Sequence, residues 1–291
     1  MLLTEDSEPG EEGAPDMLGF ARRDQWQKNK DWKNDEFWFL CKEGIPTALR
    51  ARVYSDVLKR KKYEVETRRR NDNQIHLDAS MSIYENIRVD VMAHDCLGYR
   101  QIEEDVVAFQ GFNGSRVAFD TVAVKNVLKS FVRWQHIYGM HFSYSLNYVG
   151  LVQRLMTIMT EEDAFWVFVA LQDNLLLHNQ IMQSVTFSRA GVFRHEMLTL
   201  HALVKFHLPK VYEKLEQLGL PVNCIYDKLT SFFADAFPSE LVLRLWDLIF
   251  LEVSSATTDG KKRTLWLLLA TAYYLFYVNE KEILQLSLIH I

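Results

Sequence analysis

Apolar side chains recur at helical spacing along most of the chain, most clearly between residues 148 and 177. One face with a period of about 3.6 residues is formed by Tyr148, Leu151, Val152, Leu155, Met156 and Met159. A second apolar segment begins after Thr160, whose hydroxyl can cap the first turn. Asp163, three residues later, can complete a reciprocal capping interaction. The pattern predicts two core helices, 149–159 and 164–177, that meet at a short polar break.

The rest of the chain is typical of an all-α fold. The same spacing predicts further helices at 20–43, 46–58, 80–90, 120–132, 192–208, 226–236, 239–250 and 262–279. Gly44 and Pro209 mark helix ends, and Asp120 is a capping residue. Residues 97–114 carry only a weak helical pattern, so we expect a loop with one helical turn there. No segment alternates apolar and polar residues as a strand does, and we predict a single all-α domain of about a dozen helices.

The composition supports a globular protein and argues against a nucleic-acid partner. Of 291 residues, 48% are hydrophobic and 13% aromatic, enough for a sizeable core, and the net charge of −5 provides no basic field for DNA or RNA. Cys41, Cys96 and Cys224 are far apart and lack metal-ligand spacing, as expected in a reducing compartment. No secretory signal pattern begins the chain. The most apolar run, 265–278, is shorter than the roughly 18 residues of a membrane span. We expect a cytoplasmic protein in which 265–278 is a buried helix.

Three further segments fall outside the predicted core. Residues 1–19 are acidic and contain glycine and proline, which predicts a disordered lead-in. The basic run Lys59-Arg60-Lys61-Lys62 and Arg68-Arg69-Arg70 is interpreted most simply as a solvated helix end; the alternative is peripheral contact with an anionic endomembrane or an acidic partner. Residues 286–291, LSLIHI, match what a common transposon-based library adapter encodes in frame. We therefore expect this tail to be foreign and the domain, 20–285, to be truncated.

Four short segments are more specific than the helical pattern. In chain order they are Gly44-Ile45-Pro46 with Leu49-Arg50 and Val53-Tyr54; Ile87-x-x-Asp90; Glu161-Glu162-x-Ala164-Phe165-Trp166; and Arg244-Leu245-Trp246-Asp247 after Phe237-Pro238. They resemble, respectively, the GIPxxLRxxVW, IxxDxxR, EExAFW and lP…RiWD segments of the TBC domain, the Rab GTPase-activating family, with Tyr54 in place of tryptophan. Each motif alone is weak, but four in order over residues 40–285 make a strong resemblance.

The resemblance implies an all-α domain that acts on a Rab-type GTPase, with GTP and Mg²⁺ carried by that partner and no metal or cofactor of its own. TBC domains are understood to supply two side chains to the partner's nucleotide, the arginine of IxxDxxR and the glutamine of YxQ. An arginine finger accelerates hydrolysis by about 10³–10⁵. By the same resemblance, the expected partner-binding residues are Arg50, Ile87, Asp90 and Asn147.

This sequence departs from the family at both catalytic positions. With the IxxDxxR motif in register, the arginine position is occupied by Ala93, which has neither charge nor hydrogen-bond donor. The GYxQGMN element falls on residues 141–147, where Tyr144 replaces the glutamine, and His141 and Ser145 replace the glycines. A phenol lacks the paired donor and acceptor of an amide. Candidate replacements for the missing arginine are Arg88, Arg100 and the neighbouring His94.

Three hypotheses follow for the function. The first, favoured by the paired loss at Ala93 and Tyr144, is a TBC-fold protein that binds a Rab-type GTPase in membrane trafficking without accelerating hydrolysis. The second is an active GTPase activator that uses a displaced arginine or the GTPase's own glutamine. The third is a scaffold without a GTPase partner. On the first hypothesis the protein is a regulator, and neither finger position holds an intact catalytic group.

Overall fold

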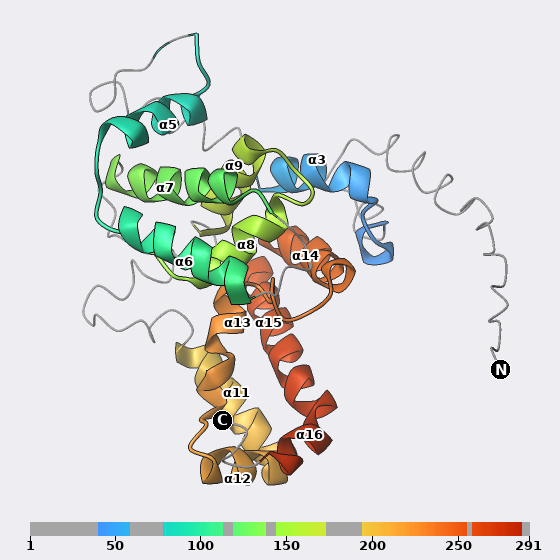
Figure 1. Cartoon of the computed structure of the whole chain (residues 1–291). Coiled ribbons are helices and arrows are strands. Elements are labelled where there is room, and N and C mark those ends of the chain that lie inside the picture. Colours follow the sequence, from blue (N-terminus) through green and yellow to red (C-terminus); the bar gives the residue numbers. More distant parts are fainter. Residues whose placement is uncertain are drawn as a thin grey trace, which may run out of the picture.

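The computed structural model describes residues 40–58, 78, 80–112, 119–137, 144–172, 194–254 and 258–286, and every regular element among them is a helix (Figure 1). The first group of helices consists of α3 Thr47–Val57, α5 Ile83–Ala93, α6 Tyr99–Phe112, α7 Thr121–Ile137, α8 Asn147–Leu155 and α9 Glu161–Leu171. The second group consists of α11 Arg194–His207, α12 Pro209–Gln217, the 3₁₀ turn η3 Val222–Ile225, α13 Tyr226–Thr230, α14 Ser239–Ser254, α15 Thr258–Val278 and α16 Glu280–Gln285. The predicted all-α fold is confirmed for this part of the chain.

Side chains cap the first turns of three helices next to the candidate site. The backbone N–H of Asp163 donates to the Thr160 hydroxyl at 3.2 Å, which confirms the predicted cap of α9. Backbone N–H groups in the first turn of α7 donate to the Asp120 carboxylate at 3.0 Å, as predicted. α5 begins with a capping box in which Ser82 and Glu85 satisfy each other's backbone N–H groups. These caps fix where the helices of the first group begin.

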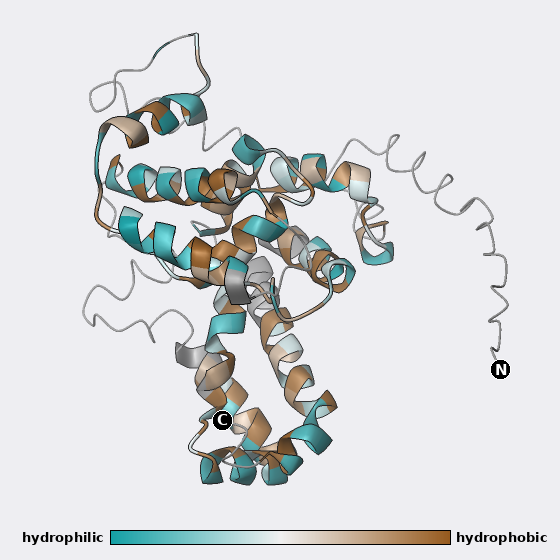
Figure 2. Ribbon diagram, in the orientation of Figure 1, coloured by the Kyte–Doolittle hydropathy of each residue, from teal (hydrophilic) through white to brown (hydrophobic). Residues whose placement is uncertain are grey.

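The core is centred on α9, in which all residues from Ala164 to Leu171 are buried. α7 packs against α9 and is flanked by α5 and α6, and α8 contacts α6, α7 and α9 (Figure 1). α14 connects the two groups of helices, because it packs against both α3 and α15. Hydrophilic and hydrophobic bands alternate on α6 and α7, as expected of helices that bury one face (Figure 2).

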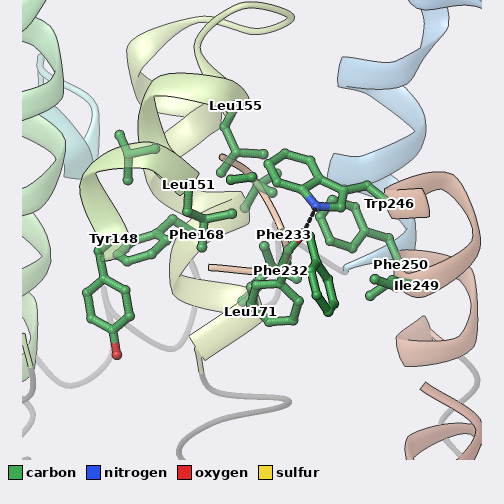
Figure 3. Packing of buried hydrophobic residues seen from close by; sticks show 14 of the residues in the cluster. Tyr148, Leu151, Leu155, Phe168, Leu171, Phe232, Phe233, Trp246, Ile249 and Phe250 are labelled. Carbon is green, nitrogen blue, oxygen red and sulfur yellow. Dashed lines mark hydrogen bonds between the residues drawn. The ribbon is translucent and has the colours of Figure 1, made fainter. Parts of the chain in front are cut away.

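Aromatic side chains fill the space between α8, α9 and α14 (Figure 3). Trp166 and Trp246 are both fully buried. Trp246 stacks on Phe250 with 5.5 Å between ring centroids, and its Nε1 donates to the Phe232 carbonyl at 2.9 Å. That hydrogen bond holds the turn after α13, where Phe232 and Phe233 have φ values of 50° and 59°.

A buried ion pair joins the beginning of the described chain to α14. The carboxylate of Asp247, which has no exposed surface, accepts hydrogen bonds from the Arg50 guanidinium at 3.1 Å and the Tyr54 hydroxyl at 2.7 Å. Gly44, with a φ of 114°, makes the turn before α3, and a Cβ at this position would collide with the Arg244 guanidinium. The GIPxxLR-like and RLWD segments are therefore in direct contact.

Several predicted elements in the described chain are wrong. The core helix predicted at 149–159 ends at Leu155, because residues 156–159 form turns and a bend. Residues 97–114, expected to be a loop with one helical turn, contain the helix α6, because Ile102 and Val106 bury one face while charged residues occupy the other. The helix predicted at 226–236 ends at Thr230, since the chain turns at the two phenylalanines that follow. Pro209 ends α11 as predicted, but it also begins α12, at the first helical position where proline is tolerated.

The last long helix, α15, is only partly buried, so the prediction of a buried helix at 265–278 is wrong for one of its faces. Leu268 lies in the core, whereas Trp266, Tyr274 and Tyr277 are more than half exposed. None of the helices in the described ranges combines the length and the hydropathy needed to cross a bilayer.

Several predictions concern residues outside the described part of the chain. They are the lead-in at 1–19, most of the helix at 20–43, the basic run at 59–62 and 68–70, the end of the core helix at 173–177, and the tail from 287 to 291. They stay predictions.

Candidate functional site

One aspartate fixes the C-terminal end of α5, where the IxxDxxR-like motif lies. The Asp90 carboxylate accepts a hydrogen bond from Arg133 Nε on α7 and contacts His94 Nδ1 at 2.9 Å. The His94 backbone N–H also donates to the Asp90 carbonyl at 3.1 Å. Because the Asp90 side chain is only 11% exposed, its carboxylate is committed to holding the helix end and the turn that follows.

An open cavity of about 620 Å³ lies beside this helix end. It is lined by Ala93 of α5, by Arg100 and Glu103 of α6, and by Lys129 of α7, among others. Ala93 is the exposed last residue of α5, and its side chain ends at Cβ. The position that carries arginine in the IxxDxxR motif is therefore part of the wall of a surface cavity, with no donor of its own.

The lysine and arginine side chains that line this cavity are each paired with a carboxylate. Glu103 accepts hydrogen bonds from Lys125, at 2.5 Å, and from Lys129, and these ammonium groups hold the pKa of Glu103 below its usual range. Arg100 pairs with Glu104 one helical turn along at 2.9 Å. Both cations that line the cavity are therefore already paired with carboxylates, at the place where the motif would supply a free guanidinium.

The two arginines considered as replacements lie in different places. Arg100 lines the same cavity as Ala93, and its side chain is 92% exposed. Arg88 instead lies against α9, where its Nη1 is 3.3 Å from the carboxylate of Glu161. The same carboxylate accepts a hydrogen bond from the Tyr84 hydroxyl at 2.7 Å. The structure thus brings Arg100 together with Ala93 and holds Arg88 elsewhere.

Tyr144 turns its phenol into the protein. The hydroxyl oxygen is buried, and the ring packs edge-on against Tyr148 with 6.2 Å between centroids. Burial, and then the Asp105 carboxylate on α6, raise the pKa of the Tyr144 hydroxyl above its usual range. The hydroxyl oxygen of Tyr144 is therefore not presented at the surface of the domain. His141, in the same element, lies outside the described residues.

The other expected partner-binding residues are packed against neighbouring helices. Arg50 is 7% exposed within its ion pair, and Ile87 is fully buried, so neither side chain offers surface to a partner. Asn147 donates from Nδ2 to the Asp227 carboxylate at 3.0 Å and to the Thr230 hydroxyl at 2.9 Å. These contacts tie α8 to α13, and the three side chains position the helices around the site.

Sequence reasoning missed the α7 cations of this site. Lys125, Lys129 and Arg133 recur every four residues, a spacing that places them on one face of α7, and that stripe was an available signal. Glu103, the carboxylate partner of the two lysines, could not be placed, because α6 was not predicted. Among the described residues, no group of three or more histidine, cysteine or carboxylate side chains is arranged to hold a metal ion.

The fold and the site define the class: an all-helical domain whose GIPxxLR-like and RLWD segments are in direct contact, and whose IxxDxxR-like helix end lines an open cavity. Residues 47–284 match the family model of the Rab-GTPase-TBC domain. Because the match spans most of the chain, the protein belongs to this family.

Several curated relatives are similar to this chain over part of their length. A TBC domain-containing protein of Schizosaccharomyces pombe is 24% identical over 224 residues, which is 74% of this chain and 25% of the relative. Growth hormone-regulated TBC protein 6 of Caenorhabditis elegans is 28% identical over 120 residues, 40% of this chain and 34% of the relative. The chain thus spans about a quarter to a third of these proteins.

A solved structure supports the fold. The crystal structure of the Chlamydomonas flagellar RabGAP TBC domain aligns with a TM-score of 0.63 over 92% of this chain and 82% of that one. At 19% identity, this likeness establishes the arrangement of helices and carries no information about activity.

Proposed function

We propose that this protein is a TBC-domain regulator that binds a Rab-type GTPase at the surface around the end of α5 and does not accelerate GTP hydrolysis through the two usual finger positions. The nucleotide and its Mg²⁺ would be carried by the GTPase. The protein would act in membrane trafficking from the cytoplasm, with peripheral contact to endomembranes through the basic run at 59–62 and 68–70.

The observation that carries this proposal is the state of the two finger positions. The side chain of Ala93 lines the cavity and ends at Cβ, and the Tyr144 hydroxyl is buried beside α6. The framework around them is intact, since Asp90, Arg133 and the Arg50–Asp247 pair hold the helices in place. A missing arginine finger alone removes about 10³–10⁵ in rate.

A second candidate is an activator that uses a displaced arginine. Two observations support Arg100 for this role: it lines the same cavity as Ala93, and its pair with Glu104 is an exposed one worth about 0.3–0.5 kcal/mol. Arg88 is held by Glu161 and serves as the matched control.

The test is a panel of Rab GTPases measured in parallel for binding and for single-turnover hydrolysis. We expect at least one GTPase to bind, with a hydrolysis rate within about tenfold of its intrinsic value. Fast hydrolysis that is lost in Arg100→Ala and kept in Arg88→Ala would establish the second candidate. Absence of binding to every GTPase would favour a scaffold without such a partner.

A further inference from the structure

Four apolar side chains gather at the end of α5, and we call this group the α5 patch: Val89, Met92, Ala93 and Leu97. The first three are spaced three and four residues apart, so they lie on one face of the helix, and Leu97 is in the turn that follows. Met92 is 74% exposed and Leu97 83% exposed. Single exposed apolar residues are ordinary, but a group of them beside a cavity is typical of a binding surface.

The charges next to the α5 patch are poorly suited to an anion. Two full cations line the cavity, Arg100 and Lys129, and each already pairs with a carboxylate of α6. Three carboxylates line it as well, since Asp95 joins Glu103 and Glu104. A nucleotide phosphate brought to this place would meet at least as much negative as positive charge. An uncharged group placed here would leave the existing ion pairs undisturbed.

We propose that the α5 patch binds an apolar side chain on the surface of the GTPase partner, which packs on Met92 at the cavity wall and on Leu97 in the turn that follows α5. This inference rests on the function proposed above and specifies its chemistry: affinity comes from apolar burial, without a cation–phosphate contact. Removing one methionine or leucine side chain from water strengthens an interaction by about tenfold or more. The pairing of both cavity cations with carboxylates fits the same partner, because an apolar side chain can bind without breaking an ion pair.

The experiment compares the full chain with the double variant Met92→Gln/Leu97→Gln against a GTPase that the wild type binds. Glutamine keeps a similar length, adds no charge and is a good helix former, so it removes apolar surface without altering the electrostatics. The control is Leu198→Gln on α11, a leucine that is 61% exposed in the second group of helices. Arg100→Ala and Glu104→Gln test the cation, and each affinity is measured at about 0.1 M and about 1 M salt.

We expect the double glutamine variant to bind at least about tenfold more weakly, with Leu198→Gln unchanged. Arg100→Ala and Glu104→Gln should change affinity by less than about threefold, and salt should have little effect. The inference alone is overturned if the double variant binds like the wild type, or if Arg100→Ala weakens binding tenfold in a salt-dependent manner. If the wild type binds no GTPase, the proposed function falls together with it.

Discussion

Returning an arginine to the empty position is the most direct perturbation of the site. Ala93 is exposed and ends α5, so Ala93→Arg should change the free energy of unfolding by less than about 0.5 kcal/mol, and a cation there suits the helix dipole. The new guanidinium would share the cavity with Asp95, Glu103 and Glu104. A surface ion pair of about 1 kcal/mol with one of these carboxylates would keep the guanidinium away from the nucleotide for most of the time.

The rate expected for Ala93→Arg follows from these terms. A free arginine finger is worth about 10³–10⁵; restraint by the carboxylates and the lack of an amide at Tyr144 each lower this by about tenfold, which leaves a gain of roughly 10- to 1,000-fold. Single-turnover hydrolysis at saturating domain concentration measures the bound complex, so a weaker affinity does not obscure the result. Ala93→Lys is the control, since an ammonium lacks the planar fork and should gain less. A variant that binds the GTPase and hydrolyses no faster than the wild type would refute the placement of Ala93 against the nucleotide.

Three further predictions concern the scaffold. Trp166→Ala should lower the free energy of unfolding by about 3–5 kcal/mol in a denaturant titration, because the ring is fully buried; a neutral result would contradict its place in the core. Asp247→Ala should cost about 3–5 kcal/mol, since it leaves the Arg50 guanidinium buried and unpaired, and Asp247→Asn should cost less. Cys41 should resist a thiol reagent until the protein unfolds, because burial, and then the Asp247 carboxylate, raise the pKa of its thiol; rapid labelling in native buffer would count against this packing.

The predictability of the fold followed the strength of local patterns. α8 and α9 were predicted because their apolar spacing and the Thr160 cap act within one segment. The end of α13 could not be predicted, because apolar residues rarely adopt positive φ, and Phe232 is held there by a hydrogen bond from Trp246 on the following helix, α14. α6 was missed because its buried face is narrow and its other positions mix charged, polar and exposed apolar residues.

The candidate site was predictable as a set of positions and not as an arrangement. The motif register alone led to Ala93 and Tyr144. The buried phenol of Tyr144 lies near Asp105 of α6, a helix that the sequence did not reveal. The choice between Arg88 and Arg100 likewise depends on contacts between helices, with Glu161 for the first and with the cavity for the second. Spacing along one helix contains no information of that kind.

The two altered positions differ in how they can be reversed. Ala93 faces an open cavity, so a longer side chain can be added there without moving the backbone. Tyr144 fills space inside the domain, and a shorter amide in its place would leave a gap beside Tyr148. An amide that stays inside is also unable to orient a water molecule outside. We therefore expect that adding Tyr144→Gln to Ala93→Arg leaves the hydrolysis rate unchanged and lowers the free energy of unfolding. That result would mean that the missing glutamine function depends on the backbone path before α8 as well as on the side chain at position 144.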